Sequence, residues 1–262
     1  MVNALKLINI TFPRSKRYLW KAFYTILALS KKNQNIHFMN YGFTMKNPIS
    51  LEKIDSNNLY RIQLYHRLIM NIDIKNKDIL EVGCGRGGGC SYYSRYLKPN
   101  SVTGIDLSGL NINICKKSHK DITFQVGDAE NIPFPDNHFD VLINLESSHC
   151  YPNFLKFMEE SYRVLRNNSY LCFADFVITE DIDKIRKNMI SAGFKIIEEV
   201  DLTENVLDAI IKDNELNKFK ETNRIFNINL RKLTGADGSS ERGLIPMFKN
   251  KSLVHIHFLL QK

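Results

Sequence analysis

Three acidic residues each follow an apolar stretch of the sequence, and the first of them leads into a glycine-rich run. Glu81 opens the run of residues 81–89, Asp106 closes the next apolar stretch, and Asp128 follows the third. Glycine allows a sharp turn whose backbone can lie against a ligand, and the free N–H groups of a following helix attract negative charge. An acid at the end of the second strand can accept hydrogen bonds from ribose hydroxyls. The spacing therefore predicts a nucleoside-binding site at strand ends.

Two features favour S-adenosylmethionine over a dinucleotide, although Gly83, Gly85 and Gly88 also match the pattern G-x-G-x-x-G. Glu81 lies two residues before the first glycine, where a carboxylate would favour a cationic amino-acid ligand over a pyrophosphate. The stretch 127–134 looks like the adenine-contacting loop of class I methyltransferases, in which the acid binds the exocyclic amine. We therefore expect binding of S-adenosylmethionine and not of NAD.

The predicted cofactor site combines the glycine run with the ends of the neighbouring strands and one aromatic residue from the N-terminal part. Tyr41 is included because such an aromatic can fold over the cofactor, with a purely structural aromatic as the alternative. The predicted residues are Tyr41, Glu81, Gly83, Cys84, Gly85, Gly87, Asp106, Leu107, Asp128, Ala129 and Asn144.

A histidine and an aspartate are the candidate catalytic residues. Methyl transfer needs an oxygen nucleophile held in line with the methyl group, and a positioned base adds a factor of about 10²–10⁴ for a hydroxyl. His149 follows the fourth strand, and the unperturbed pKa of histidine suits base chemistry near neutrality. Asp175 ends the fifth strand and could orient that imidazole or contact the substrate. The alternatives are a capping or packing role for His149 and a turn role for Asp175.

The order of apolar and amphipathic stretches predicts an α/β fold. Strands alternate with helices, which indicates a Rossmann-like, mostly parallel sheet with helices on both faces and an antiparallel last strand. The expected strands are 78–82, 102–106, 122–126, 139–145, 170–176, 194–200 and 253–260. We expect a basic helical arm or lid over residues 1–58 and a methyltransferase domain over 59–262, with an insert at about 203–250.

The net charge of +8 belongs to the N-terminal part of the chain. Residues 1–51 contain eight basic and no acidic side chains, and the rest of the chain is balanced. The stretch 15–31 holds the single tryptophan, Trp20, within a basic amphipathic pattern. Such a helix can lie on an anionic membrane surface or can roof the active site.

The five cysteines show no C-x-x-C spacing, which favours reduced structural thiols and a cytoplasmic location. The sequence has no stretch long and apolar enough to suggest a membrane span, and its start resembles a signal peptide poorly. His255 and His257 share one face of the last expected strand, but no third ligand accompanies them, so no metal site is expected.

Beyond the cofactor motifs, the chain resembles the phthiotriolone and phenolphthiotriolone dimycocerosate methyltransferases, and more loosely sugar and small-molecule O-methyltransferases. The resemblance implies a class I fold, S-adenosylmethionine as donor, and methylation of a hydroxyl on a lipid, polyketide or other small metabolite. One departure is Asn167-Asn168-Ser169, where these enzymes usually carry Pro-Gly-Gly; asparagine tolerates the left-handed conformation that such a turn needs. The matching stretches are 40–43, 64–67, 87–92, 115–119, 127–130, 146–152 and 174–175.

The sequence therefore predicts a methyltransferase that acts on a hydroxyl of a small, apolar acceptor, with peripheral membrane contact through the arm as a further possibility. The alternatives are C-methylation of a small molecule, methylation of RNA, and a non-catalytic protein that retains the cofactor pocket. Against RNA, the fourth strand ends in Asn144-Leu145-Glu146-Ser147 and lacks an Asn-Pro-Pro-Tyr type of motif. We expect no nucleic acid partner.

Overall fold

A seven-stranded sheet forms the centre of the computed structural model, which describes residues 37–218 and 244–262. The strand order is β3-β2-β1-β4-β5-β7-β6. The strands are β1 (Asp78–Val82), β2 (Ser101–Asp106), β3 (Thr123–Val126), β4 (Phe139–Leu145), β5 (Leu165–Ile178), β6 (Lys195–Asp201) and β7 (Leu253–Gln261).

Strands β1 to β5 pair in parallel, and β7 runs antiparallel between β5 and β6. This arrangement confirms the expected fold class, including the antiparallel pairing of the last strand. The α-helices are α3 (Leu59–Ile69), α4 (Gly88–Leu97), α5 (Gly109–Ser118), α6 (Phe154–Val164), α7 (Ile182–Ser191), α8 (Thr203–Lys218) and α10 (Leu244–Lys249), and the 3-10 helices are η2 (Lys53–Asn58), η3 (Ser148–Cys150) and η4 (Thr179–Asp181).

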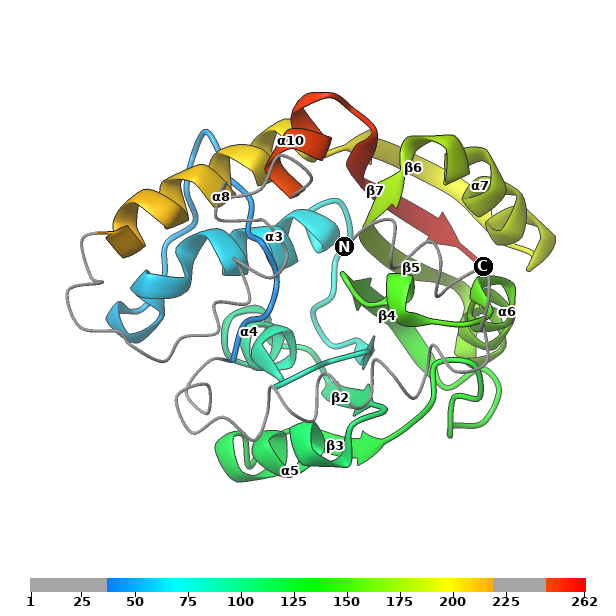
Figure 1. Ribbon diagram of the computed structural model, residues 1–262. Coiled ribbons are helices and arrows are strands. Elements are labelled where there is room, and N and C mark those ends of the chain that lie inside the picture. Colours follow the sequence, from blue (N-terminus) through cyan, green and yellow to red (C-terminus); the bar gives the residue numbers. More distant parts are fainter. Residues whose placement is uncertain (1–36, 219–243) are drawn as a thin grey trace.

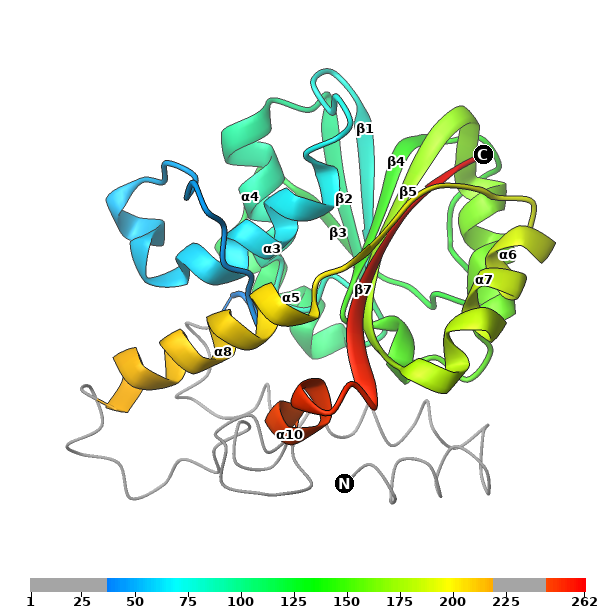
Figure 2. The same cartoon turned by 90° about the horizontal axis from the view of Figure 1, so that it is seen from above.

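The helices cover both faces of the sheet, as Figures 1 and 2 show. Helices α3, α4, α5, α8 and α10 pack on one face around one buried apolar cluster, and α6 and α7 pack on the other face around a second. Strand β1 is buried on both faces, as expected for a central parallel strand. Helix α6 buries Phe157, Met158, Ser161 and Val164 at helical spacing, and Asn153 caps its first turn by accepting a hydrogen bond from Lys156 N at 3.1 Å.

Segment 37–44 precedes the sheet in sequence and is fixed to two distant helices, α3 and α8. Phe43 N donates to Tyr60 O at 2.8 Å, and Thr44 N donates to Asn205 O at 3.2 Å on α8. Asn205 Nδ2 donates in return to Thr44 O at 2.9 Å. The segment therefore lies as a fixed layer beside the sheet.

Several expectations from the sequence change in detail. Strand β5 starts at Leu165, earlier than expected, and runs through Asn168, whose φ of 60° is the left-handed conformation that asparagine tolerates. Within the expected insert, α8 and α10 are described, while residues 219–243 lie outside the described part. The expected arm lies outside it up to residue 36. Among the described helices, none has the length and apolar character needed to cross a bilayer.

A close helix–strand contact should make Gly89 intolerant of a side chain. A Cβ at Gly89 would lie 2.3 Å from Tyr65 Cε1 and 2.7 Å from both carboxylate oxygens of Glu81. Since these neighbours are buried, we expect Gly89→Ala to lower the free energy of unfolding by about 1–3 kcal/mol. Gly109→Ala is the matched control, because its nearest contact is Val126 Cγ2 at 3.6 Å. Urea denaturation should show this control unchanged or slightly stabilised; equal losses in both variants would contradict the packing argument.

Candidate active site

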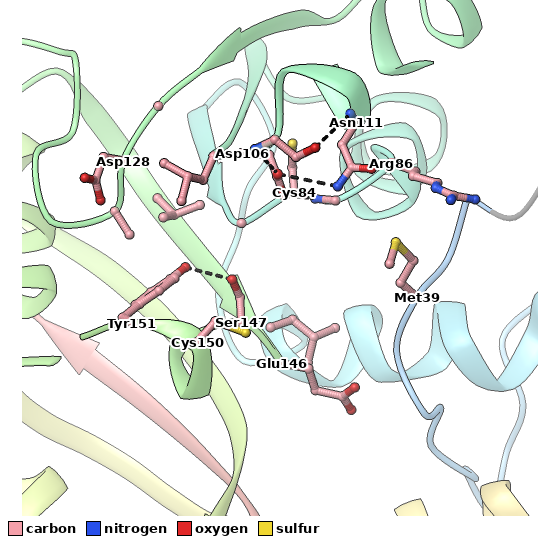
Figure 3. A pocket seen from close by; sticks show the side chains of 18 of the residues that line it. Met39, Cys84, Arg86, Asp106, Asn111, Asp128, Glu146, Ser147, Cys150 and Tyr151 are labelled. Atoms are coloured by element: carbon pink, nitrogen blue, oxygen red, sulfur yellow. Dashed lines mark hydrogen bonds between the residues drawn. The ribbon is translucent and has the colours of Figure 1, made fainter. Parts of the chain in front are cut away.

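A cavity open to solvent lies at the carboxyl ends of β1, β2 and β4 (Figure 3). Its walls come from residues 37, 39–40, 82–86, 106–108, 127–130, 145–147 and 150–152, together with single residues of α3 and α5. Ligands of open parallel sheets bind outside the carboxyl ends of the strands, so this is the expected place for a cofactor.

The glycine run reaches the cavity because two of its residues adopt positive φ angles. Gly83 has φ 75° and Gly85 has φ 53°. A Cβ at Gly83 would lie only 1.9 Å from Ser147 Oγ, so the loop packs directly on the residues that follow β4. Glycine at this position is therefore required by contact as well as by conformation.

Asp106 ends β2 and faces the same loop. Its carboxylate accepts hydrogen bonds from Gly85 N at 3.0 Å and Ser108 N at 2.8 Å, and Asn111 Nδ2 lies 3.4 Å away. Burial raises the pKa of Asp106 to about 6, although these hydrogen bonds act in the opposite direction. The predicted ribose-binding acid thus lies on the cavity wall, with its ionised form populated at neutral pH.

The other predicted residues of this wall also line the cavity: Gly83, Cys84, Gly85, Leu107, Asp128 and Ala129. Asp128 accepts a hydrogen bond from Glu130 N at 3.0 Å, which shapes the loop after β3. In Figure 3, Asp106 and Asp128 lie along one side of the cavity and Glu146 lies on the opposite side.

Four predicted cofactor residues lie outside the cavity lining. Gly87, with φ 77°, is the residue before α4 and packs against Phe124. Asn144 donates to Val82 O and to the Tyr151 hydroxyl, both at 2.9 Å. It thereby fixes two residues of the cavity lining without lining the cavity itself. Tyr41 donates its backbone N–H to Glu146, and its ring packs edge-on against Phe176.

Glu81, the fourth of these residues, points into the layer between β1 and α4. Its carboxylate accepts a hydrogen bond from Cys90 Sγ at 3.0 Å and interacts with the Tyr65 hydroxyl. Burial raises the pKa of Glu81 to about 7. In this position Glu81 acts on the cavity through Tyr65, which lines it.

His149 and Asp175 form the expected pair. His149 Nδ1 lies 3.0 Å from Asp175 Oδ1, and the His149 backbone N–H donates to Asp175 Oδ2 at 3.0 Å. Burial acts to lower the pKa of His149, but Cys150 and Asp175 outweigh it and raise the pKa well above 6.5. The pair lies beside the cavity lining, which includes Cys150 but neither His149 nor Asp175.

Several lining residues were not among the sequence-based candidates. Met39 and His37 come from segment 37–44, and Arg86 comes from the glycine run itself. Glu146 and Tyr151 belong to the 146–152 stretch, which the sequence had singled out, although only His149 was selected from it. Their position directly after β4, at the carboxyl edge of the sheet, was the signal that could have identified them.

The charges of the lining fit a cationic nucleoside. Among the described lining residues, the acids are Asp106, Asp128, Glu130 and Glu146, while Arg86 and His37 are the basic residues. An excess of carboxylates favours a positively charged sulfonium, whereas a pyrophosphate would be repelled. Within the described part of the chain, no group of three or more His, Cys, Asp or Glu is arranged to hold a metal ion.

Comparison with known proteins agrees with this site. Residues 80–173 match the model of a methyltransferase domain. A phthiotriol/phenolphthiotriol dimycocerosates methyltransferase of Mycobacterium leprae is 35% identical over 201 residues, which cover 75% of this chain and 74% of that protein. A fatty-acid O-methyltransferase of Mycolicibacterium smegmatis is 39% identical over 181 residues, with 68% and 66% covered.

A dimycocerosates methyltransferase of Mycobacterium tuberculosis is 44% identical over 161 residues, and the chain spans 60% of the length of that relative. Among solved structures, a geranyl diphosphate C-methyltransferase from Streptomyces coelicolor aligns with a TM-score of 0.64 at 15% identity, covering 92% of this chain and 97% of that one. A cyclopropane synthase from M. tuberculosis aligns with a TM-score of 0.62 at 13% identity, with 89% and 95% covered.

The fold and the matched domain define a class I methyltransferase, whose methyl donor is S-adenosyl-L-methionine. The chain belongs to the family of the phthiotriol/phenolphthiotriol dimycocerosates methyltransferases. The resemblance found in the sequence motifs is thereby confirmed.

The pKa of Asp106 leads to a prediction for cofactor binding. Because the ionised carboxylate is the better acceptor for ribose hydroxyls, the affinity for S-adenosylhomocysteine should fall as the pH drops through about 6. Asp106→Asn should bind more weakly at pH 8 and should lose most of this pH dependence. Calorimetric titration between pH 5 and 8 checks both points. An unchanged pH dependence in the variant would remove Asp106 from the binding interaction.

Proposed function

We propose that this protein transfers a methyl group from S-adenosylmethionine to a hydroxyl of a small apolar metabolite, such as a lipid or polyketide. The observation that carries the proposal is membership of a family whose named relatives act on dimycocerosates. A relative named as a fatty-acid O-methyltransferase supports only the coarser points, a lipid acceptor and methylation at oxygen. The acid-lined cavity at the strand ends supports the same reading, since it suits a cationic donor.

The residues of the chain would bind and orient both reactants. Asp106 and Asp128 would hold the nucleoside on one wall, with the glycine run providing close backbone approach. When bound, S-adenosylmethionine supplies a methyl group on a positively charged sulfur. Segment 37–44, with Met39 and Asn40 in the lining, restricts access of water from its side. Holding an acceptor oxygen in line with that methyl group accounts for much of the expected acceleration.

The base proposed from the sequence, His149, has an electrostatic setting that limits this role. The raised pKa of His149 favours the imidazolium form, and an imidazolium donates a proton rather than accepting one. As a base, His149 would require a rate that rises with pH through this raised pKa. As a positioning residue, it would order the 146–152 stretch through Asp175 and Phe176, whose ring centroid lies 4.3 Å from that of His149.

The reaction is tested by following a deuterated methyl group from S-adenosylmethionine. We expect the label to appear in an apolar lipid fraction as an O-methyl group and to be absent from total RNA. Fragmentation of the labelled product distinguishes oxygen from carbon attachment. Label in RNA would contradict the proposal, and binding of S-adenosylhomocysteine without any transfer to lipids would favour a non-catalytic cofactor-binding protein.

A cytoplasmic location with peripheral membrane contact through the N-terminal arm, residues 1–58, is a further proposal, supported by the excess of basic side chains in residues 1–51. The full chain should sediment with vesicles that contain anionic lipid at low salt, and deletion of residues 1–14 should weaken this binding. Added salt should act similarly, because exposed charges are screened over about 10 Å at 0.1 M ionic strength. Neutral vesicles are the control. Equal binding of the full chain and of the chain lacking residues 1–14 to anionic vesicles would contradict a role for residues 1–14 in membrane contact.

A further inference from the structure

We propose that Glu146 is the catalytic group that receives the proton of the acceptor hydroxyl, and that His255 and the Tyr41 backbone position it. The proposal deepens the function given above and rests on it. It assigns the proton transfer to a residue of the cavity wall, one that neither the sequence motifs nor the comparisons assign.

Glu146 occupies the place where an acceptor must be recognised. It follows directly after β4 and lines the cavity on the side opposite Asp106 and Asn111 (Figure 3). Its side chain is only 5% exposed. With the nucleoside on the Asp106 wall, the acceptor has to lie toward the Glu146 wall.

Two donors hold the carboxylate in place. His255 Nε2 lies 3.0 Å from Glu146 Oε1, and Tyr41 N donates to Oε2 at 3.2 Å. His255 Nδ1 is buried without a hydrogen-bond partner among the described residues, so the tautomer with its hydrogen on Nε2 satisfies the ring best. Since an ionised carboxylate has about four lone-pair sites, these donors leave acceptor capacity for a ligand hydroxyl.

The backbone of Glu146 is held in a conformation that glutamate rarely adopts. Its φ is 46°, in the left-handed region, and its N–H donates to Ala174 O at 2.8 Å on β5. Such backbone strain persists where the surrounding structure enforces it, and it concentrates at functional sites. With this backbone conformation, directly after the last residue of β4, the Glu146 side chain reaches His255.

The ionisable side chains near Glu146 include those of His255 and Arg61. The ring of His255 lies at hydrogen-bonding distance, with 3.0 Å between Nε2 and Glu146 Oε1. Arg61 on α3 interacts electrostatically with Glu146, but its guanidinium forms a salt bridge with Asp213 at 2.6 Å. The raised pKa of His149, on the same stretch, favours its imidazolium form. Of the two acid–histidine pairs beside the cavity, Glu146–His255 is the one whose acid is a residue of the lining.

The proposed step balances charge and atoms. A lone pair of the acceptor oxygen forms the bond to the methyl carbon, and the pair of the carbon–sulfur bond remains on sulfur. The O–H bond breaks and its proton passes to Glu146 Oε2. A sulfonium cation and a carboxylate anion thus become a neutral thioether and a neutral acid, which a buried site favours. An acceptor that carried its own carboxylate would be repelled by Glu146, so the site should select alcohols over fatty acids.

The full chain is tested with matched variants. We expect Glu146→Gln to lower kcat by about 10²–10⁴ while affinity for S-adenosylhomocysteine stays nearly constant. Glu198→Gln is the control, because Glu198 approaches the other histidine of β7, His257, at 3.9 Å and lies outside the cavity lining. His149→Gln should cost much less than Glu146→Gln. A larger loss in His149→Gln than in Glu146→Gln would overturn the assignment.

Chemical rescue separates a proton-transfer role from a structural one. Glycine accepts the positive φ of position 146 without strain, so Glu146→Gly should fold and should leave space for a small carboxylate. Added formate should restore turnover of this variant in a concentration-dependent manner, whereas chloride at the same ionic strength should not. Equal effects of formate and chloride would overturn the proposal.

Acceptor binding gives a readout that does not depend on turnover. With the protein saturated by S-adenosylhomocysteine, calorimetry should show decanol binding more tightly than decanoate, and Glu146→Gln should reduce this preference at least about tenfold. Equal binding of decanol and decanoate to the unmodified protein would overturn the inference. Preserved alcohol selectivity without methyl transfer would instead count against the proposed function, so the two failures are distinguishable.

Discussion

The contact between the glycine run and the end of β4 is the constraint on which the site depends. Gly83 can lie against Ser147 and Tyr151 because it has no side chain, and a Cβ there would sit 1.9 Å from Ser147 Oγ. Asn144 ties the same two strand ends together through Val82 O and the Tyr151 hydroxyl. This close approach sets the position of the cofactor wall relative to the 146–152 stretch. Asp106 then reinforces the loop from the other side by accepting the Gly85 N–H.

Two carboxylate–histidine pairs flank the 146–152 stretch and differ in which partner faces the cavity lining. Asp175 is 1% exposed and holds the His149 ring beside the lining, with 3.0 Å between Asp175 Oδ1 and His149 Nδ1. Glu146 reverses this order, because its histidine is fully buried and its acid lines the cavity. The first pair is therefore suited to fixing a loop and the second to exchanging a proton with a ligand. The same two residue types differ in purpose because Glu146 is a residue of the cavity lining, whereas neither His149 nor Asp175 is.

The sequence alone predicted the sheet, its antiparallel last strand and the line of acids at the strand ends, because these follow from local periodicity and turn chemistry. It also anticipated the left-handed conformation of Asn168. The sequence could not show on which side of β1 the Glu81 side chain lies, because residues near a strand end point alternately to both faces of the sheet. In the structure the Glu81 carboxylate contacts Tyr65 of α3 and does not line the cavity. Nor could the sequence pair Glu146 with His255, which lies 109 positions away. That contact depends on β7 entering the sheet beside β5, which no local pattern specifies.

The hydrogen bonds of segment 37–44 to distant residues also determine at which stage of folding the cavity can form. Tyr41 meets Glu146 across a separation of 105 residues, and Thr44 meets Asn205 across 161. Closing such long loops costs chain entropy that early local contacts cannot offset. A nascent chain can thus form the first strands and their helices before segment 37–44, which lines one side of the cavity, is held in place. The chain should become able to bind a ligand only after α8 has been synthesised. Ligand binding would therefore report a late stage of folding.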